Sequence, residues 1–315
     1  MRGRELSTDA VAAALENSHQ AQAEIITYLE NQNNPDVVFG GRYNQLGKAQ
    51  RIGITGPPGA GKSTIVSKLL GQIRRTGSKC AVIACDPSSP YTHGALLGDR
   101  TRMADHFTDP GVFIRSMASR GHLGGLAPTT SIIADFLDLC GYPFILIETV
   151  GVGQTEVDVV SKTDTVLVVL TPESGDSIQM MKAGLLEGAD IFCVNKFDRP
   201  GGDRLIADLE FGMSLGKRDW NPPIVPTVAV KNIGISDLFN TIRRHWDYTK
   251  NTEIHDSKKL DRYITEVGFW LESRLYDVKF RENQKRLARK AIIDGIPPWQ
   301  LAESIWKEKV EAQWQ

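Results

Sequence analysis

The chain has 315 residues, a formal net charge of −1 at pH 7 and 24% charged residues. This length can bury one large core with smaller appendages, and the near-zero charge offers no basic field for nucleic acid. No apolar run approaches the ~18 to 20 residues that span a bilayer, and no apolar stretch follows the basic N-terminal residues. We therefore expect a cytoplasmic protein that binds neither nucleic acid nor membrane.

Residues 1–45 are predicted to form an N-terminal helical extension. In ELSTDAVAAALENSHQAQAEIITYLENQ, residues 5–32, apolar side chains recur at helical spacing. An amphipathic helix outside a complete core must bury its apolar stripe either on that core or against another chain. The sequence leaves both alternatives open.

The segment GITGPPGAGKSTIVSKLL, residues 53–70, passes from an apolar strand through a glycine-rich turn into a helical pattern. Residues 56–63 read G-x-x-x-x-G-K-S, the phosphate-binding loop, whose backbone N–H groups and helix N-terminus favour phosphate oxygens. We expect Lys62, solvated at the mouth of the empty loop, to bridge the outermost phosphates, and Ser63 to ligate Mg²⁺. The predicted phosphate-binding residues are Gly56, Pro57, Pro58, Gly59, Ala60, Gly61, Lys62, Ser63 and Thr64.

Residues 46–250 are predicted to be the core domain. Its short apolar runs are RIGIT, CAVIACD, VFIRSM, YPFILIET, TVLVVLT, DIFCVNK and IVPTVAV. Continuous apolar strands separated by helix-length segments indicate a mostly parallel sheet covered on both faces, hence an α/β P-loop NTPase. Because CAVIACD follows the phosphate-loop helix directly, the first crossover should be parallel, as in the class of signal-recognition GTPases and metallochaperones.

Three carboxylates stand where strands should end near the phosphates: Asp86, Asp99 and Glu148. Mg²⁺ prefers hard oxygen ligands and keeps several waters, so direct ligation by all three is not required. Asp99 could instead be a helix N-cap. Gly151 should let the backbone approach the γ-phosphate.

The motif N-K-x-D at residues 195–198 predicts guanine as the base, and GTP and GDP as the ligands. A carboxylate at Asp198 can accept two hydrogen bonds from guanine N–H groups, an arrangement that adenine does not offer. We expect Asn195 to tie this loop to neighbouring segments and the stem of Lys196 to lie over the ring. The predicted set is completed by Val228, Ala229 and Val230. The alternative is a charged turn.

Residues 251–315 are predicted to be a C-terminal helical extension, which could be a dimerisation arm. Its helical stretch carries apolar residues such as Trp270, Trp299 and Trp306. The cysteines occur singly and form no C-x-x-C pair, so we interpret them as small core residues. They are Cys80, Cys85, Cys140 and Cys193.

The blocks GPPGAGKS, DPSSPYTHGALLGDRTRM, ETVGVGQ and NKFD, in this order, resemble the MeaB/ArgK/MMAA family. Its members are GTPase chaperones of adenosylcobalamin-dependent acyl-CoA mutases. The resemblance implies Mg²⁺ binding and nucleotide-linked switching by Asp86, Asp99 and Glu148, and a further switch segment at residues 171–184 containing a functional Lys182. Lys62, Asp99, Glu148 and Lys182 form the predicted catalytic set. Within this resemblance, TPE and NKFDRPGGDR are similar to the GTPase module of fused isobutyryl-CoA mutases.

The resemblance implies a GTPase that gates adenosylcobalamin loading, protection or reactivation of a B12-dependent acyl-CoA mutase. The implied partners are the mutase's B12-binding subunit or domain, a cobalamin adenosyltransferase and a second copy of this chain. Val152 follows Gly151 where Ras-like proteins place a water-orienting glutamine, so we expect slow intrinsic turnover that a partner stimulates. Two alternatives stay open: a P-loop metabolite kinase and a nucleotide-dependent metallochaperone.

Overall fold

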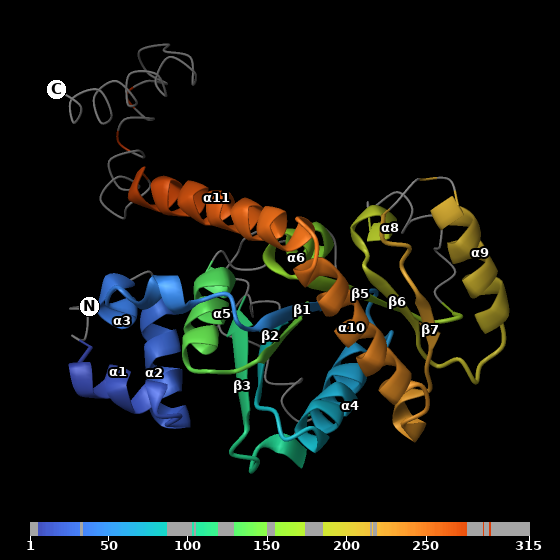
Figure 1. Ribbon diagram of the computed structural model, residues 1–315, viewed down its shortest axis with the longest axis horizontal. Coiled ribbons are helices and arrows are strands. Elements are labelled where there is room, and N and C mark those ends of the chain that lie inside the picture. Colours follow the sequence, from blue (N-terminus) through green and yellow to red (C-terminus); the bar gives the residue numbers. More distant parts are fainter. Residues whose placement is uncertain are drawn as a thin grey trace. The chain divides into compact units, whose positions relative to one another are not determined.

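The computed structural model describes residues 6–31, 34–86, 103, 105–118, 129–149, 155–173, 185–214, 216, 219–275, 286 and 290. The chain divides into two compact units, Met1–Arg262 and Tyr263–Gln315. The first unit holds the sheet and the helices that cover it (Figure 1). None of the described helices is both long and apolar enough to cross a membrane.

The described strands form one seven-stranded sheet in the order β3-β2-β4-β1-β5-β6-β7. They are β1 (Gln50–Thr55), β2 (Cys80–Asp86), β3 (Val112–Ala118), β4 (Phe144–Glu148), β5 (Thr165–Leu170), β6 (Ile191–Val194) and β7 (Ile224–Pro226). Every pairing between these seven described strands is parallel, including the pairings of β2, the strand that follows the first crossover. The predicted parallel α/β sheet is therefore confirmed.

The last strand is shorter than its apolar run suggests. The run IVPTVAV contributes only Ile224–Pro226, and the 3-10 helix η3 (Ala229–Lys231) follows it. Val228 forms an antiparallel bridge with Ile233, which turns the chain out of the sheet. The strand β7 therefore ends where the chain enters this turn, although the residues that follow are still apolar.

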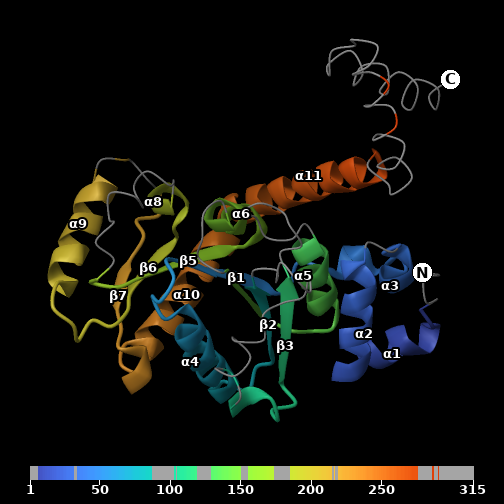
Figure 2. The same ribbon diagram turned by 180° about the vertical axis from the view of Figure 1, so that it is seen from behind.

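The helices within the first unit pack on both faces of the sheet (Figure 1, Figure 2). Listed in chain order, they are α1 (Thr8–Leu15), α2 (His19–Glu30), α3 (Asp36–Phe39), η1 (Arg42–Gln45), α4 (Lys62–Arg75), α5 (Thr129–Leu139), α6 (Thr155–Lys162), α8 (Leu185–Gly188), α9 (Gly202–Ser214) and α10 (Ile235–Lys250). The helix α11 (Ile254–Leu275) begins in the first unit and continues past its end.

Alternate residues of the strands point to opposite faces, which fixes where each helix packs. On one face, Ile52 and Ile54 of β1 join a core cluster with Leu69 of α4 and Ile242 of α10. On the other face, a Cβ added at Gly53 would lie 2.5 Å from Cγ2 of Val159, so α6 packs directly on the backbone of β1. A glycine in mid-strand here permits close approach of helix and sheet.

The N-terminal helices pack on the core, which decides between the two alternatives for their apolar stripe. Ser18 caps α2, and Ile25 and Ile26 on that helix are fully buried. Gln22 accepts a 3.0 Å hydrogen bond from the Tyr142 hydroxyl, and the side chains of Arg115 and Glu30 form an ion pair. Since Arg115 belongs to the edge strand β3, this ion pair attaches α2 to the edge of the sheet.

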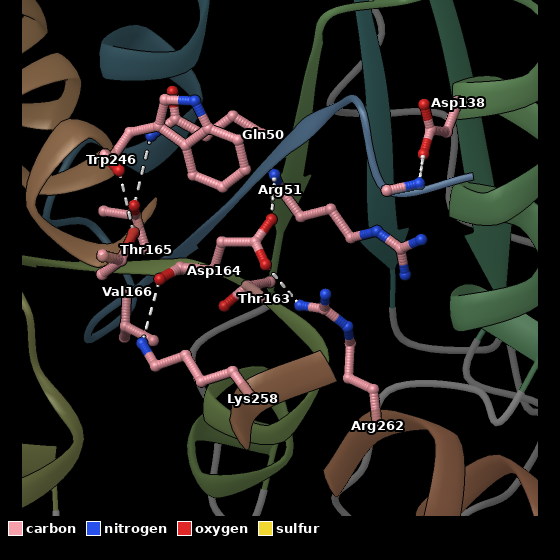
Figure 3. Close-up of polar contacts among 12 residues, drawn as sticks. Gln50, Arg51, Asp138, Thr163, Asp164, Thr165, Val166, Trp246, Lys258 and Arg262 are labelled. Carbon is pink, nitrogen blue, oxygen red and sulfur yellow. Dashed lines mark hydrogen bonds and ion pairs between the residues drawn. The ribbon is translucent and has the colours of Figure 1, made fainter. Parts of the chain in front are cut away.

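Charged side chains gather at the edge where the strands begin (Figure 3). Asp164, just before β5, accepts a 2.8 Å hydrogen bond from the Arg51 N–H and pairs with Arg262 at 2.5 Å. Lys258 donates to the Asp164 carbonyl at 2.9 Å and to Asp190, just before β6, at 3.0 Å. The start of α11 is therefore attached to the starts of β1, β5 and β6, and the opposite edge of the sheet is left for the predicted site.

All four cysteines are buried and unbridged, which confirms their interpretation as core residues. Burial raises the pKa of the Cys193 thiol to about 12, with the Thr227 hydrogen bond acting in the opposite direction. Burial likewise raises the pKa of Cys140 to about 12. Such thiols are protonated at neutral pH and are poor nucleophiles and metal ligands.

Candidate nucleotide-binding site

The predicted site residues follow the carboxyl ends of neighbouring strands. The phosphate loop follows β1, Glu148 ends β4, and Asn195 follows β6. β1 and β5 are neighbours, and the chain leaves β1 toward β2 on one side of the sheet but leaves β5 toward β6 on the other. In open parallel sheets, ligands bind in the crevice at such a switch point.

Two glycines of the loop are required by close backbone approach. Gly56 has φ +137°, and a Cβ there would lie 2.0 Å from the Val169 carbonyl oxygen of β5. Gly61 has φ +93°, and a Cβ there would lie 2.4 Å from Nδ2 of Asn195. A larger residue at Gly56 would push the phosphate loop away from β5, and one at Gly61 would push it away from Asn195.

Lys62 is buried, contrary to the expectation of a solvated lysine. Its side chain folds back over the loop, and Nζ donates to the carbonyl oxygens of Gly56 at 2.8 Å and Pro57 at 3.1 Å. The residue is 7% exposed. The physical reason is that the loop curls around the ammonium, so its own carbonyls replace water as acceptors.

Ser63 and Glu148 meet at the start of α4. The Ser63 hydroxyl donates to Oε1 of Glu148 at 2.6 Å, and both residues are buried. A hydroxyl and a carboxylate side by side are hard oxygen ligands that fit Mg²⁺. Asp86, the last residue of β2, ends at the same edge of the sheet, two positions beyond the pairing of Ala84 with Glu148.

Asn195 connects three predicted parts of the site. Its Nδ2 donates to the Ala60 carbonyl of the phosphate loop at 2.9 Å. Its Oδ1 accepts from the Ala229 N–H at 3.1 Å and from the Thr227 hydroxyl at 3.2 Å. One buried amide therefore holds the phosphate loop and the segment after β7 in a fixed relation.

Asp198 lies on the exposed side of this arrangement. Its Oδ2 forms a 2.8 Å ion pair with Nζ of Lys231 at the end of η3, and the two side chains are 40% and 58% exposed. The hydrogen bond from Lys231 lowers the pKa of Asp198. Lys196 adopts a left-handed φ of +58°. Val230, next to Lys231 in the chain, is 76% exposed, so its apolar side chain faces solvent.

Several predicted site residues lie outside the described residues. These are Asp99, Gly151 and Lys182, and for Asp86 only the backbone is described. Among the remaining predicted residues, Pro58 and Gly59 are exposed at the tip of the loop, whereas Ala60 is buried under Asn195. In the part of the chain that the structure describes, no group of three or more His, Cys, Asp or Glu side chains could hold a metal ion.

Two contacting residues were not predicted from the sequence. Thr227 supports Asn195, and Lys231 pairs with Asp198, 33 positions earlier in the chain. A threonine and a lysine in a surface turn carry no motif signal. Only the turn after β7 brings them to the N-K-x-D loop.

Comparisons with known proteins point to one family. The family described as "Methylmalonyl Co-A mutase-associated GTPase MeaB" matches residues 22–284. A protein of Pyrococcus abyssi named as a GTPase is 42% identical over 303 residues, 92% of each chain. The mouse "Methylmalonic aciduria type A homolog, mitochondrial" is 37% identical over 271 residues, 82% of this chain and 65% of its own.

A solved structure shares the fold. It is described as LAO/AO transport system kinase, with a TM-score of 0.66 and 19% identity, and the match covers 96% of this chain and 99% of that one. At this identity the likeness shows the architecture alone.

Proposed function

Because this chain belongs to the MeaB family of methylmalonyl-CoA mutase-associated GTPases, we propose that its GTPase cycle gates adenosylcobalamin loading, protection or reactivation of a B12-dependent acyl-CoA mutase. The chain is a GTPase with a P-loop NTPase fold.

The observation that carries the nucleotide assignment is the position of Asn195. A glycine-rich phosphate loop and an N-K-x-D loop are common separately, but here one buried amide joins the Ala60 carbonyl to the Ala229 N–H. This contact sets the spacing between the end that would bind phosphates and the end that would read guanine. Nucleotides that fill both ends at once are GTP and GDP.

The phosphate end supplies groups suited to phosphoryl transfer. Lys62 would leave the Gly56 and Pro57 carbonyls to pair with the phosphates, and Ser63 with Glu148 would hold Mg²⁺. Bound Mg²⁺ would neutralise charge on the phosphate oxygens. Asp86 and Asp99 are proposed as further metal-site carboxylates, and the backbone at Gly151 as a contact of the γ-phosphate.

The base end would bind guanine through Asp198. The Lys196 stem and the segment Val228, Ala229 and Val230 would border the ring. The exposed Val230 side chain supports this placement, because a bound purine would cover its apolar surface. The side chain at Asn195 would maintain the loop rather than touch the base.

The switch and partner assignments extend beyond the nucleotide. We propose that Lys182, in residues 171–184, communicates with the mutase's B12-binding subunit or domain. A cobalamin adenosyltransferase is a second candidate partner, and residues 251–315 are proposed as a dimerisation arm. We expect slow intrinsic GTP hydrolysis that becomes faster when the mutase binds, because the nucleotide state would then depend on cofactor loading.

The test begins with capture of this protein from its native host and identification of any co-purifying mutase. GTP turnover is then measured with and without that mutase, and transfer of adenosylcobalamin is followed by its absorbance with GTP or a non-hydrolysable analogue. We expect turnover to rise with the mutase and transfer to differ between the two nucleotides. A mutase that binds but changes neither quantity would contradict the proposal.

A further inference from the structure

The carboxylate that should read guanine already holds a cation. Lys231 Nζ lies 2.8 Å from Oδ2 of Asp198. Lys231 lies outside the sequence motifs that predict the site. It raises the question of what the lysine does when a base arrives.

The backbone that carries Lys231 is fixed relative to Asp198. The Phe197 N–H donates to the Thr227 carbonyl at 3.0 Å, and the Ala229 N–H donates to Asn195. The Lys231 N–H closes η3 by donating to the Val228 carbonyl at 2.9 Å. With the backbone held, contact with the carboxylate depends on the conformation of the Lys231 side chain, which is 58% exposed.

Guanine and the lysine present the same polarity to Asp198. Guanine offers N–H donors at N1 and at its 2-amino group, and the ammonium offers N–H donors as well. A bound guanine must therefore share or displace the lysine. Because an ion pair between exposed side chains is weak, guanine can compete with Lys231 for the carboxylate.

A base with a carbonyl at the 2-position meets the opposite situation. In xanthine this oxygen would face a carboxylate, and two acceptors without a proton between them repel. An ammonium at the position of Lys231 can donate to both oxygens. The same lysine would thus oppose guanine and assist xanthine.

We propose that Lys231 is a specificity-determining residue of the base pocket, competing with guanine for the Asp198 carboxylate and favouring bases that carry a carbonyl at the 2-position. This inference rests on the proposed role of Asp198. It assigns to one exposed side chain opposite effects on two nucleotides. A residue that only stabilised the loop would change both affinities in the same direction.

The experiment measures dissociation constants of GDP and XDP by competition against fluorescent mant-GDP. In Lys231→Met we expect GDP to bind about 1.5- to 5-fold more tightly and XDP to bind more weakly by a similar factor. Lys231→Arg keeps the cation and should retain the wild-type ratio. Arg199→Met is the matched charge control, since Arg199 pairs with Glu173 and contributes positive charge beside the same loop. Loss of that charge should weaken both anionic nucleotides together.

Weaker or unchanged GDP binding in Lys231→Met, or equal shifts for GDP and XDP, would overturn the inference. Asp198→Ala separates this failure from failure of the proposed site. That variant should lose its preference for GDP over ADP, and adding Lys231→Met to it should give no gain for GDP. If Asp198→Ala binds GDP as well as the wild type, the base-reading assignment and the role of Lys231 are overturned together.

Discussion

At the residue scale, burial separates the two ends of the nucleotide site. Lys62 is 7% exposed and donates to two carbonyl oxygens, whereas the Asp198 side chain is 40% exposed and pairs with the exposed Lys231. A substitution at Lys62 therefore acts on the fold as well as on the ligand. A substitution at Asp198 acts mainly on the ligand.

Lys62→Ala should reduce GTP turnover by about 10² to 10³, the loss typical of one preorganised charge-stabilising donor. It should also lower the free energy of unfolding by about 1 to 3 kcal/mol, because the carbonyls of Gly56 and Pro57 lose a charged donor. Turnover and urea unfolding are measured on the same preparation. Lys68→Ala, on the same helix but outside the loop, is the control. Turnover equal in both variants would exclude the loop as the working site.

Asp198→Asn should shift selectivity from GTP toward XTP. The substitution replaces one acceptor oxygen by a donor, and xanthine presents a carbonyl where guanine presents its amine. Competition of GTP, XTP and ATP against labelled GDP measures the change. In the wild type, ATP should compete poorly; equal competition by ATP and GTP would remove Asp198 as the base reader.

At the element scale, the carboxylates that precede β5 and β6 join elements that are distant in sequence. Asp190 receives the Val166 N–H at 2.8 Å and Lys258 of α11 at 3.0 Å, and lies 3.3 Å from Nε2 of His245 on α10. Burial by itself raises the pKa of Asp190, but the hydrogen bond from His245 and the charge of Lys258 outweigh it, so the net pKa is lowered.

Asp190→Asn should lower the free energy of unfolding at pH 7 by about 1 to 3 kcal/mol, because the amide keeps an acceptor but loses the charge. A carboxyl with a lowered folded-state pKa stabilises the fold above its unfolded pKa of about 3.9, and this stability is lost as pH falls through the folded value. The difference between wild type and variant should therefore be constant near neutral pH and shrink below about pH 4.

Urea unfolding at several pH values measures this difference. Asp247→Asn, at an exposed position of α10, is the control and should show no such difference. If the difference in the free energy of unfolding between wild type and Asp190→Asn is unchanged at low pH, the ionised carboxylate does not contribute to stability.

At the scale of the whole molecule, the question is how the nucleotide state reaches a partner. The exposed ion pair of Arg199 with Glu173 links the residue after the base reader to the start of residues 171–184. The functional lysine expected there, Lys182, lies outside the described residues. The role that we propose for Lys182 is coupling between the nucleotide site and the partner.

Lys182→Ala should reduce mutase-stimulated GTP hydrolysis by about 5- to 150-fold, the range of typical coupling free energies. Basal hydrolysis should change much less, because this residue is expected to sense the partner rather than bind the base. Turnover of wild type and variant is measured with and without the cognate mutase, and the basal rate of each protein is its own control. Identical stimulation of both proteins would exclude Lys182 from the mechanism.

The sequence alone was sufficient for those features that depend on local pattern. The apolar runs predicted the parallel sheet, because a strand buried on both faces must be apolar throughout. The spacing G-x-x-x-x-G-K-S and the motif N-K-x-D predicted a guanine-nucleotide protein, because each set of groups is contiguous along the chain. The family resemblance agrees with the match over residues 22–284.

Tertiary structure decided what depends on contacts between distant segments. Lys62 is buried because the loop's own carbonyls surround it, and the N-terminal helices lie on the core because Gln22 and Glu30 find partners on other elements. Lys231 reaches Asp198 only because the turn after β7 is tied to Asn195. Hydrophobic periodicity and motif spacing report local preference. Contacts between distant segments arise only when the sheet brings the carboxyl ends of several strands to one edge.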